Sequence, residues 1–256
     1  MNTSPCSPDR ALPAPARLVR LTWLVAALAA VSSAFAAPTV VQDWEFGQAS
    51  GTSLSASTNT IAGGAAWSGT LTGVTQNGSS ALRFGYNSTT LAYRYATLGS
   101  NSGGIYTTTA IFSDWRLFNG ANSGTTRPTF YLGFRSAASS SSSLVADISL
   151  VARSGGVELA VRDSASTFVH ATLPSQLPGA LTVTLTVDKN VTPNTYTLAY
   201  AVVGGASGTV NGTLGTTSSG RAISHLSLSV AGNFTNSGTN TPHLLVRLQV
   251  AYETTT

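Results

Sequence analysis

Residues 181–188 read LTVTLTVD, and residues 195–203 read TYTLAYAVV after a short polar segment. In the first stretch Leu or Val occupies every odd position, and Thr or Asp occupies every even one. Such alternation with a period of two is typical of a β-strand with one buried face, and Thr suits the exposed side of a pleated sheet. The segment Asp188–Asn194 between the two stretches contains Pro193 and two Asn residues, which favour a turn. The two stretches therefore predict an antiparallel hairpin.

Similar alternation occurs along the whole chain from Thr39 onward, and no segment shows a helical period of 3.6 or a long internal repeat. We expect about thirteen strands at the spacing of an all-β fold, a two-sheet antiparallel β-sandwich of the jelly-roll kind. Besides the hairpin they are Val40–Phe46, Ala81–Tyr86, Leu91–Leu98, Ile105–Phe112, Thr129–Arg135, Leu144–Ala152, Val157–Val161, Thr167–Thr172, Ser207–Leu214, Leu226–Val230 and Val246–Tyr252.

The N-terminus has the pattern of a secretory signal peptide. Three Arg and one Asp occur in residues 1–20, an apolar run LTWLVAALAAV fills residues 21–31, and the small-residue exit Ala34-Phe35-Ala36 follows. Eleven residues at about 1.5 Å each cannot cross a hydrocarbon core of roughly 30 Å. We therefore expect residues 1–37 to be removed by cleavage near Ala36/Ala37. The mature form would be a single domain of residues 38–256, secreted to the periplasm or the exterior without a membrane span.

Composition excludes several classes of function. Only 9% of the residues are charged, and the net charge of +4 falls to +2 once the signal peptide is removed. Nucleic-acid binding is therefore not expected, because it requires clustered Lys and Arg. With 42% apolar residues the chain is not intrinsically disordered. The only cysteine, Cys6, lies in the signal peptide, so the mature form has no disulfide, thiolate ligand or cysteine nucleophile.

Three segments resemble concanavalin A-like sandwiches, in particular their LamG-like members. Asp43-Trp44-Glu45-Phe46 followed by Ser50-Gly51-Thr52 is similar to the first strand and turn of those domains. The hairpin of residues 181–203 resembles their mid-sheet hairpin, and Leu244–Tyr252 resembles their last strand, which pairs near the first. The resemblance implies two packed antiparallel sheets with a concave face that commonly binds carbohydrate. Some relatives also hydrolyse or eliminate glycans.

No cofactor is expected, and the one alternative is a structural calcium ion. Asp43 and Glu45 share a strand face, and the resemblance implies that they could hold a structural calcium ion, as in some relatives. Calcium takes about six to eight oxygen ligands, and no loop rich in Asp accompanies this pair. The other interpretation is a strand whose acidic face is solvated.

Five residues are candidates for contact with sugar rings, whose C–H faces stack on aromatic side chains. They are Trp67, in the Gly- and Ala-rich segment Gly63–Gly69 that we expect to be a loop, Tyr93 and Tyr95 on one strand face, and Trp115 with its neighbour Arg116. The alternative is that these large aromatics pack in the core or against each other.

Catalytic patterns are scarce. Among the eight acidic residues of the mature form only Asp43 and Glu45 are two positions apart, and the Glu-x-Asp-x-x-Glu pattern of laminarinase-like hydrolases is missing. A polysaccharide lyase would need a base, for which Tyr93, Tyr95 and His170 are candidates, and a cation such as Arg135 to neutralise a uronate. The residue two positions before His170 is Phe168, where one alginate lyase family has Gln. The alternative is that all these residues are structural.

The sequence thus predicts a secreted, non-catalytic β-sandwich module that binds extracellular polysaccharide or another cell-surface glycan or ligand. Two alternatives stay open. One is an enzyme on the same fold, a polysaccharide lyase before a glycoside hydrolase. The other is a structural or adhesive surface protein whose Thr- and Ser-rich faces serve assembly.

The signal-peptide prediction is tested by the N-terminus of the exported chain. The protein recovered outside the cytoplasm should begin at Ala37 or Pro38, as shown by N-terminal sequencing. Recovery of a chain that still begins at Met1 in the membrane fraction would instead indicate an uncleaved anchor.

Overall fold

In a computed structural model of the protein, the strands at the centre of the molecule consist of alternating apolar and polar residues. In β11 (Leu181–Asp188) the four odd positions are fully buried, and the polar residues between them are partly exposed. β11 pairs along its whole length with the antiparallel strand β12 (Thr195–Val202), so the predicted hairpin is confirmed. The structure describes residues 38–69, 71, 74–78, 81–84, 87–114, 127–139, 141–153, 155–175, 177–233 and 244–254. The predicted signal peptide lies outside them.

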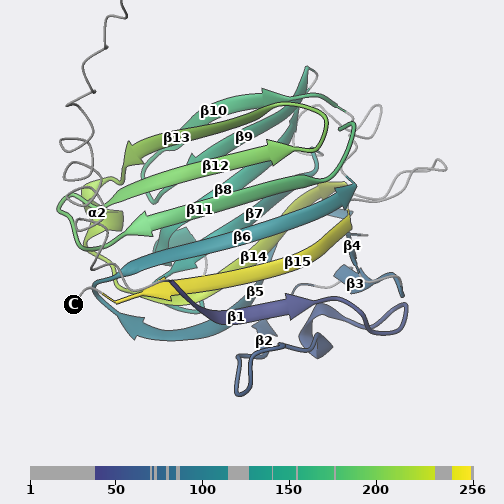
Figure 1. Ribbon diagram of the computed structural model, residues 1–256, viewed down its shortest axis with the longest axis horizontal. Coiled ribbons are helices and arrows are strands. Elements are labelled where there is room, and N and C mark those ends of the chain that lie inside the picture. Colours follow the sequence, from purple (N-terminus) through teal and green to yellow (C-terminus); the bar gives the residue numbers. More distant parts are fainter. Residues whose placement is uncertain are drawn as a thin grey trace, which may run out of the picture. The chain divides into compact units, whose positions relative to one another are not determined.

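The strands form two antiparallel sheets, which Figure 1 shows as stacked layers. The strand order of sheet A is β13 (Ser207–Thr213), β12, β11, β6 (Ile105–Asp114), β15 (Leu244–Glu253), β4 (Leu82–Phe84) and β3 (Val74–Gln76), with β1 (Thr39–Glu45) also paired to β15. The strand order of sheet B is β10 (Thr167–Leu173), β9 (Gly156–Arg162), β8 (Leu144–Arg153), β7 (Thr129–Arg135), β14 (Ile223–Asn233), β5 (Asn87–Asn101) and β2 (Trp67–Gly69).

This architecture confirms the predicted all-β sandwich. All thirteen expected strands are present, and the last strand pairs with the first as expected. Two strands of the described part of the chain, β2 and β3, were missed. Each has three residues, and neither lies in a longer alternating stretch as β4 does in Ala81–Tyr86. The short helices are η1 (Leu54–Ala56), η3 (Ser141–Ser143) and α2 (Thr216–Ser219). Within the described part of the chain no helix is long and apolar enough to span a membrane.

The inner faces of the two sheets enclose one hydrophobic core that is rich in aromatic rings. The rings of Phe84 and Phe112 both meet that of Phe130 edge-on, with centroids 5.6 and 5.3 Å away. Full burial of such a side chain contributes about 1.5–3 kcal/mol. The largest fully buried apolar side chains are Trp44, Phe46, Leu54, Phe84, Tyr106, Phe112, Phe130 and Phe134. They fix the spacing of the sheets and so the positions of their outer faces.

The two outer faces differ. On sheet A the outward residues of β11 are the partly exposed threonines that alternation predicts. On sheet B the first seven residues of β8, Leu144–Leu150, are all buried, although every second one points away from the core. Other side chains therefore cover the middle of the outer face of sheet B. A polar residue buried there needs partners within the protein.

Gly133 lies on β7 at the centre of this covered face, where the strands approach closely. A Cβ atom on Gly133 would lie 2.2 Å from the carbonyl oxygen of Ala146 and 2.3 Å from the Cα of Asp147. Both contacted atoms belong to the backbone of β8, so neither can move aside without displacing the strand. The absence of a side chain at this position lets β8 take its observed place.

We expect Gly133→Ala to destabilise the protein, because the added methyl group forces β7 and β8 apart. The free energy of unfolding should fall by about 1–3 kcal/mol in a urea titration. Gly47→Ala is the control, since a Cβ there meets nothing within 4 Å. Equal stability of the two variants would contradict the close approach at Gly133.

Candidate functional site

The register of sheet B places a set of polar and aromatic side chains on its outer face. Tyr95 of β5 is paired with Ser227 of β14, Ser227 with Gly133 of β7, Gly133 with Asp147 of β8, and Asp147 with Arg162 of β9. Since paired residues point to the same side of a sheet, one row of side chains crosses five strands. We call the six large or charged members of this region the tyrosine–arginine face: Tyr93, Tyr95, Tyr131, Arg135, Asp147 and Arg162.

Asp147 holds the tyrosine–arginine face together by ion pairs. Its carboxylate is fully buried and accepts two hydrogen bonds from Arg162, at 3.1 Å from Nε and 2.7 Å from Nη2. Nη2 of Arg135, a guanidinium that is also fully buried, lies 3.5 Å from the same carboxylate. Nε of Arg135 donates to the hydroxyl of Ser227 at 2.6 Å. A buried carboxylate with two guanidinium partners is strongly oriented, because leaving any of them unpaired is costly.

The tyrosines complete the face by packing on each other and on the two guanidinium groups. The rings of Tyr93 and Tyr95 are stacked, with centroids 5.8 Å apart and planes 6° apart. The guanidinium carbon of Arg135 lies 5.0 Å from the ring centroid of Tyr93, and that of Arg162 lies 3.7 Å from the ring centroid of Tyr131. Both are cation–π contacts, which fix the orientation of ring and cation together.

Burial governs the ionisation of these groups. It raises the pKa of Tyr95 and of Tyr131 above the usual value for tyrosine. It also raises the pKa of Asp147, against the opposite effect of the two arginines. Both tyrosines are therefore neutral hydrogen-bonding groups at neutral pH. A tyrosine that serves as a general base needs a lowered pKa instead.

Only part of the tyrosine–arginine face is accessible. Arg135 and Asp147 have no exposed surface and Tyr95 is 8% exposed, whereas Tyr93, Tyr131 and Arg162 are partly exposed. A ligand on this surface would meet two tyrosine rings and one guanidinium group. Below them, the hydroxyl of Ser229 is buried and has no hydrogen-bond partner in the part of the chain described.

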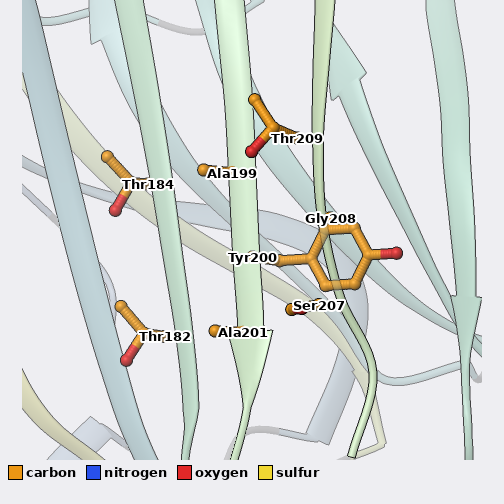
Figure 2. Close-up of a pocket in the computed structure, with 8 residues that line it drawn as sticks. All are labelled: Thr182, Thr184, Ala199, Tyr200, Ala201, Ser207, Gly208 and Thr209. Carbon is orange, nitrogen blue, oxygen red and sulfur yellow. The ribbon is translucent and has the colours of Figure 1, made fainter. Parts of the chain in front are cut away.

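Sheet A offers a different surface, a shallow groove along β12. Figure 2 shows Thr182 and Thr184 of β11 on one side, Ser207 and Thr209 of β13 on the other, and the small residues Ala199 and Ala201 between them. Hydroxyl groups and methyl groups line this groove, together with Tyr200 and Gly208. None of the lining residues is charged. The groove on sheet A therefore lacks the cation and the stacked rings that the outer face of sheet B presents.

The structure brings three of the four residues predicted for a lyase together, namely Tyr93, Tyr95 and Arg135. His170 is not among them, so of the three candidate bases only the two tyrosines lie near Arg135. Nε2 of His170 lies 3.0 Å from the hydroxyl of Tyr196 in sheet A, and its ring packs against that tyrosine. Burial lowers the pKa of His170. The alternation of β10 puts His170 on the side of its strand that faces sheet A, away from the tyrosine–arginine face.

Of the other residues predicted to touch sugar, Trp67 is placed differently from expectation. It begins strand β2 instead of lying in a loop, and its side chain is only 4% exposed. Its ring packs at 4.8 Å against that of Trp44 in the core. A sugar cannot stack on a ring buried in this way. Trp115 and Arg116 lie outside the described residues.

The acidic pair proposed for calcium is engaged by an arginine. Asp43 accepts hydrogen bonds from Arg247, at 3.0 Å from Nε and 2.6 Å from Nη2, and from the amide of Gln249 at 3.3 Å. These contacts with Arg247 lower the pKa of Asp43. Glu45 is exposed and paired in register with Arg247. A calcium ion at Asp43 would have to displace the guanidinium. Among the described residues no three His, Cys, Asp or Glu side chains are grouped so as to hold a metal.

Sequence reasoning missed four residues of the outer face of sheet B: Tyr131, Asp147, Arg162 and His225. His225 is paired in register with Arg135, so it lies beside the tyrosine–arginine face. Each of the four occupies a polar or aromatic position in an alternating strand, which was the only available signal. That signal shows that a residue leaves the core, but it does not show which other residue lies opposite it.

Comparison with known proteins supports the fold. No protein-family model and no curated protein matches the chain. Among solved structures, the CBM2 module of the evolved Dit of Lactobacillus casei BL23 phage J-1 is 11% identical with a TM-score of 0.53, over 86% of this chain and 99% of that one. Lectin II from Ulex europaeus is 10% identical (TM-score 0.49, 82% and 97%). The endo-1,3-beta-glucanase from Streptomyces sioyaensis is 14% identical (TM-score 0.48, 86% and 99%).

The chain is thus a two-sheet antiparallel β-sandwich, as its sequence predicted, and it shares its fold with the CBM2 module. At this level of identity the likeness establishes the fold alone.

Asp147→Asn should strongly destabilise the protein, because it leaves two guanidinium groups facing a neutral amide in a buried place. The free energy of unfolding should fall by about 3–5 kcal/mol, measured by chemical denaturation. Glu158→Gln is the matched control, since Glu158 pairs with the partly exposed Arg153. It should cost less than about 1 kcal/mol. A stable Asp147→Asn protein would show that the ion pairs do not organise this face.

Proposed function

We propose that this protein is a secreted, non-catalytic carbohydrate-binding module that holds polysaccharide on the outer face of sheet B. The observation that carries the proposal is the tyrosine–arginine face itself. Tyr93 and Tyr131 are partly exposed rings held rigidly by a stacking partner and by guanidinium groups. Sugar rings bind to such preorganised aromatic side chains through their C–H faces, and nearby polar groups hydrogen-bond the hydroxyls.

Rigidity supports a binding role. A ligand loses less affinity when the protein side chains that it contacts need no further ordering. Asp147 orients Arg162, Arg162 covers the ring of Tyr131, and Arg135 covers that of Tyr93. Because these contacts form when the protein folds, the side chains lose their conformational entropy in folding and not when a ligand binds.

The ionisation of the same residues disfavours the lyase alternative. Tyr95 is almost fully buried and its pKa is raised, which is the wrong direction for a base at neutral pH. His170 is separated from Tyr95 and Arg135, as described above. We therefore propose binding without bond cleavage, and the fold similarity to a glucanase does not alter this, because fold alone does not determine activity.

Native affinity electrophoresis of the protein in gels cast with a panel of polysaccharides tests the proposal. We expect retardation in at least one gel, with the polymer left intact. Tyr93→Ala should weaken this retention about 3- to 10-fold, as expected for the loss of one stacking contact, without changing the unfolding midpoint by more than a few degrees.

Thr184→Ala on sheet A is the control and should bind like the wild type. Equal loss of retention in both variants would contradict a site on sheet B. Release of shortened or unsaturated sugars would show an enzyme. Normal migration in every gel would favour the structural or adhesive alternative.

A further inference from the structure

One edge of sheet A lacks the features that usually keep a sheet from pairing with another chain, which are a very short strand, charged residues or a β-bulge. In the described part of the chain the end strands β2 and β3 have three residues each. The register of β10 shifts after Val169. β1 carries Asp43 and Glu45, and its register shifts after Val40. By contrast β13, at the opposite end of sheet A from β3 (Figure 1), has seven residues, no charge and no shift.

The hydrogen bonds at the two ends of β13 show which of its backbone groups face the open edge. The N–H of Val202 donates to the carbonyl of Ala206, and the N–H of Leu214 donates to that of Asn194, both at 2.8 Å. Both bonds extend the ladder between β12 and β13, and both use an even-numbered residue on the β13 side. Residues that bond the neighbouring strand alternate with residues whose N–H and C=O groups point the other way. The residues whose groups face the edge are therefore Ser207, Thr209, Asn211 and Thr213.

The sequence of β13, Ser-Gly-Thr-Val-Asn-Gly-Thr, is nearly symmetric about its central residue, Val210. A second β13, laid antiparallel with the two Val210 residues opposite each other, places Gly208 opposite Gly212 and Thr209 opposite Asn211. The four odd-numbered residues of each copy then form four hydrogen-bonded pairs with two bonds in each pair. This register satisfies every backbone group that points to the edge. Because β13 has no charged residue, the two copies do not repel each other there.

The outward side chains of β13 fit the same register. The hydroxyl of Thr197 donates to Oδ1 of Asn211 at 2.7 Å, within one chain. The Nδ2 group of Asn211 is left to donate to the hydroxyl of Thr209 in the second copy. The symmetry of the pair makes this contact twice.

The inward side of β13 also has the shape that such a junction needs. Val210 is paired with the fully buried Leu198 and so faces the core, yet it is only partly buried because no strand lies beyond it. The rings of Tyr200 and Tyr196 lie across Gly208 and Gly212, where a Cβ atom would collide with them. Figure 2 shows the ring of Tyr200 at Gly208. In the paired register each Tyr200 ring meets the Tyr196 ring of the second copy, and together they cover the two Val210 side chains.

We propose that this protein forms a symmetric dimer in which two copies pair antiparallel through β13, with the two-fold axis at Val210 and sheet A continuous through both copies. The axis of such a pair is perpendicular to the sheet, so both copies turn the same outer face to the same side. The dimer then presents two tyrosine–arginine faces to one polymer, and bivalent binding raises avidity without any new contact. Only this last consequence rests on the proposed function.

Sedimentation equilibrium of the purified protein tests the dimer without any ligand. We expect a concentration-dependent equilibrium that ends at twice the mass of one chain. A chain that stays monomeric up to about 1 mM would overturn the inference, and so would growth into larger assemblies, because a symmetric pair closes at two copies. Retention of polysaccharide by such a monomer would leave the proposed function intact, and a dimer that binds no polysaccharide would leave the dimer intact.

A cysteine at the two-fold axis tests the register, since the only cysteine of the sequence, Cys6, lies in the predicted signal peptide. Residue 210 and its copy form a non-hydrogen-bonded pair with Cα atoms about 4.5 Å apart, which a disulfide can bridge. Val210→Cys should therefore form a covalent dimer under mild oxidation about 10-fold faster or more than Val203→Cys. Val203 is the matched control because it is 67% exposed and lies in the β12–β13 turn. Equal rates would overturn the pairing centred on Val210.

A charge at the edge tests β13 as the interface. Thr209→Lys should raise the dissociation constant of the dimer about 10-fold or more, because it brings two ammonium groups together at the junction. Thr182→Lys adds the same charge to the same outer face two strands away, and should change the constant less than about 2-fold. Both side chains are at least partly exposed, so both variants should fold. A Thr209→Lys dimer as tight as the wild type would overturn the proposal.

Discussion

The carboxylate of Asp147 organises the outer face of sheet B. It is buried among side chains and not in the hydrophobic core, and it binds Arg162 through two hydrogen bonds while Arg135 approaches from β7. Because a buried charge is tolerated only when it is paired, these residues have one arrangement that is much better than the others. The rings of Tyr93 and Tyr131 then take their places on the guanidinium groups. One ionic interaction thus determines the shape of a surface that spans five strands.

The hydrophobic core supports this surface from below. Phe130, Phe134 and their aromatic neighbours set the distance between the sheets, and the inward residues of β7 and β8 hold those strands in register. Gly133 allows the close approach of the two strands at the centre of the face. The opposite face, on sheet A, is built by the same alternation but carries mainly threonine. A single fold therefore presents one charged, aromatic surface and one neutral, hydroxyl-rich surface.

The fold could be predicted because its cause is local. A strand such as Leu181–Asp188 places its apolar residues on one side whatever its neighbours are, so alternation identified thirteen of the fifteen strands in the described part of the chain. Trp67 was misplaced for the converse reason. It lies among Gly and Ala residues that suggest a loop, yet it enters the core against Trp44, a partner more than twenty positions away. Nothing in the local sequence encodes that contact.

The candidate site shows the same division. The sequence by itself determined that Tyr93 and Tyr95 share a strand face, because their spacing of two residues in a strand requires it, and the structure shows their rings stacked. The alternation within the expected strand Leu144–Ala152 also places Asp147 on the side opposite its apolar residues, whereas Arg162 lies just beyond the expected strand Val157–Val161. Only the tertiary structure decided that these residues meet, and that His170 does not join them. The order and register of five strands bring them together, and these depend on contacts throughout the core and not on any one segment.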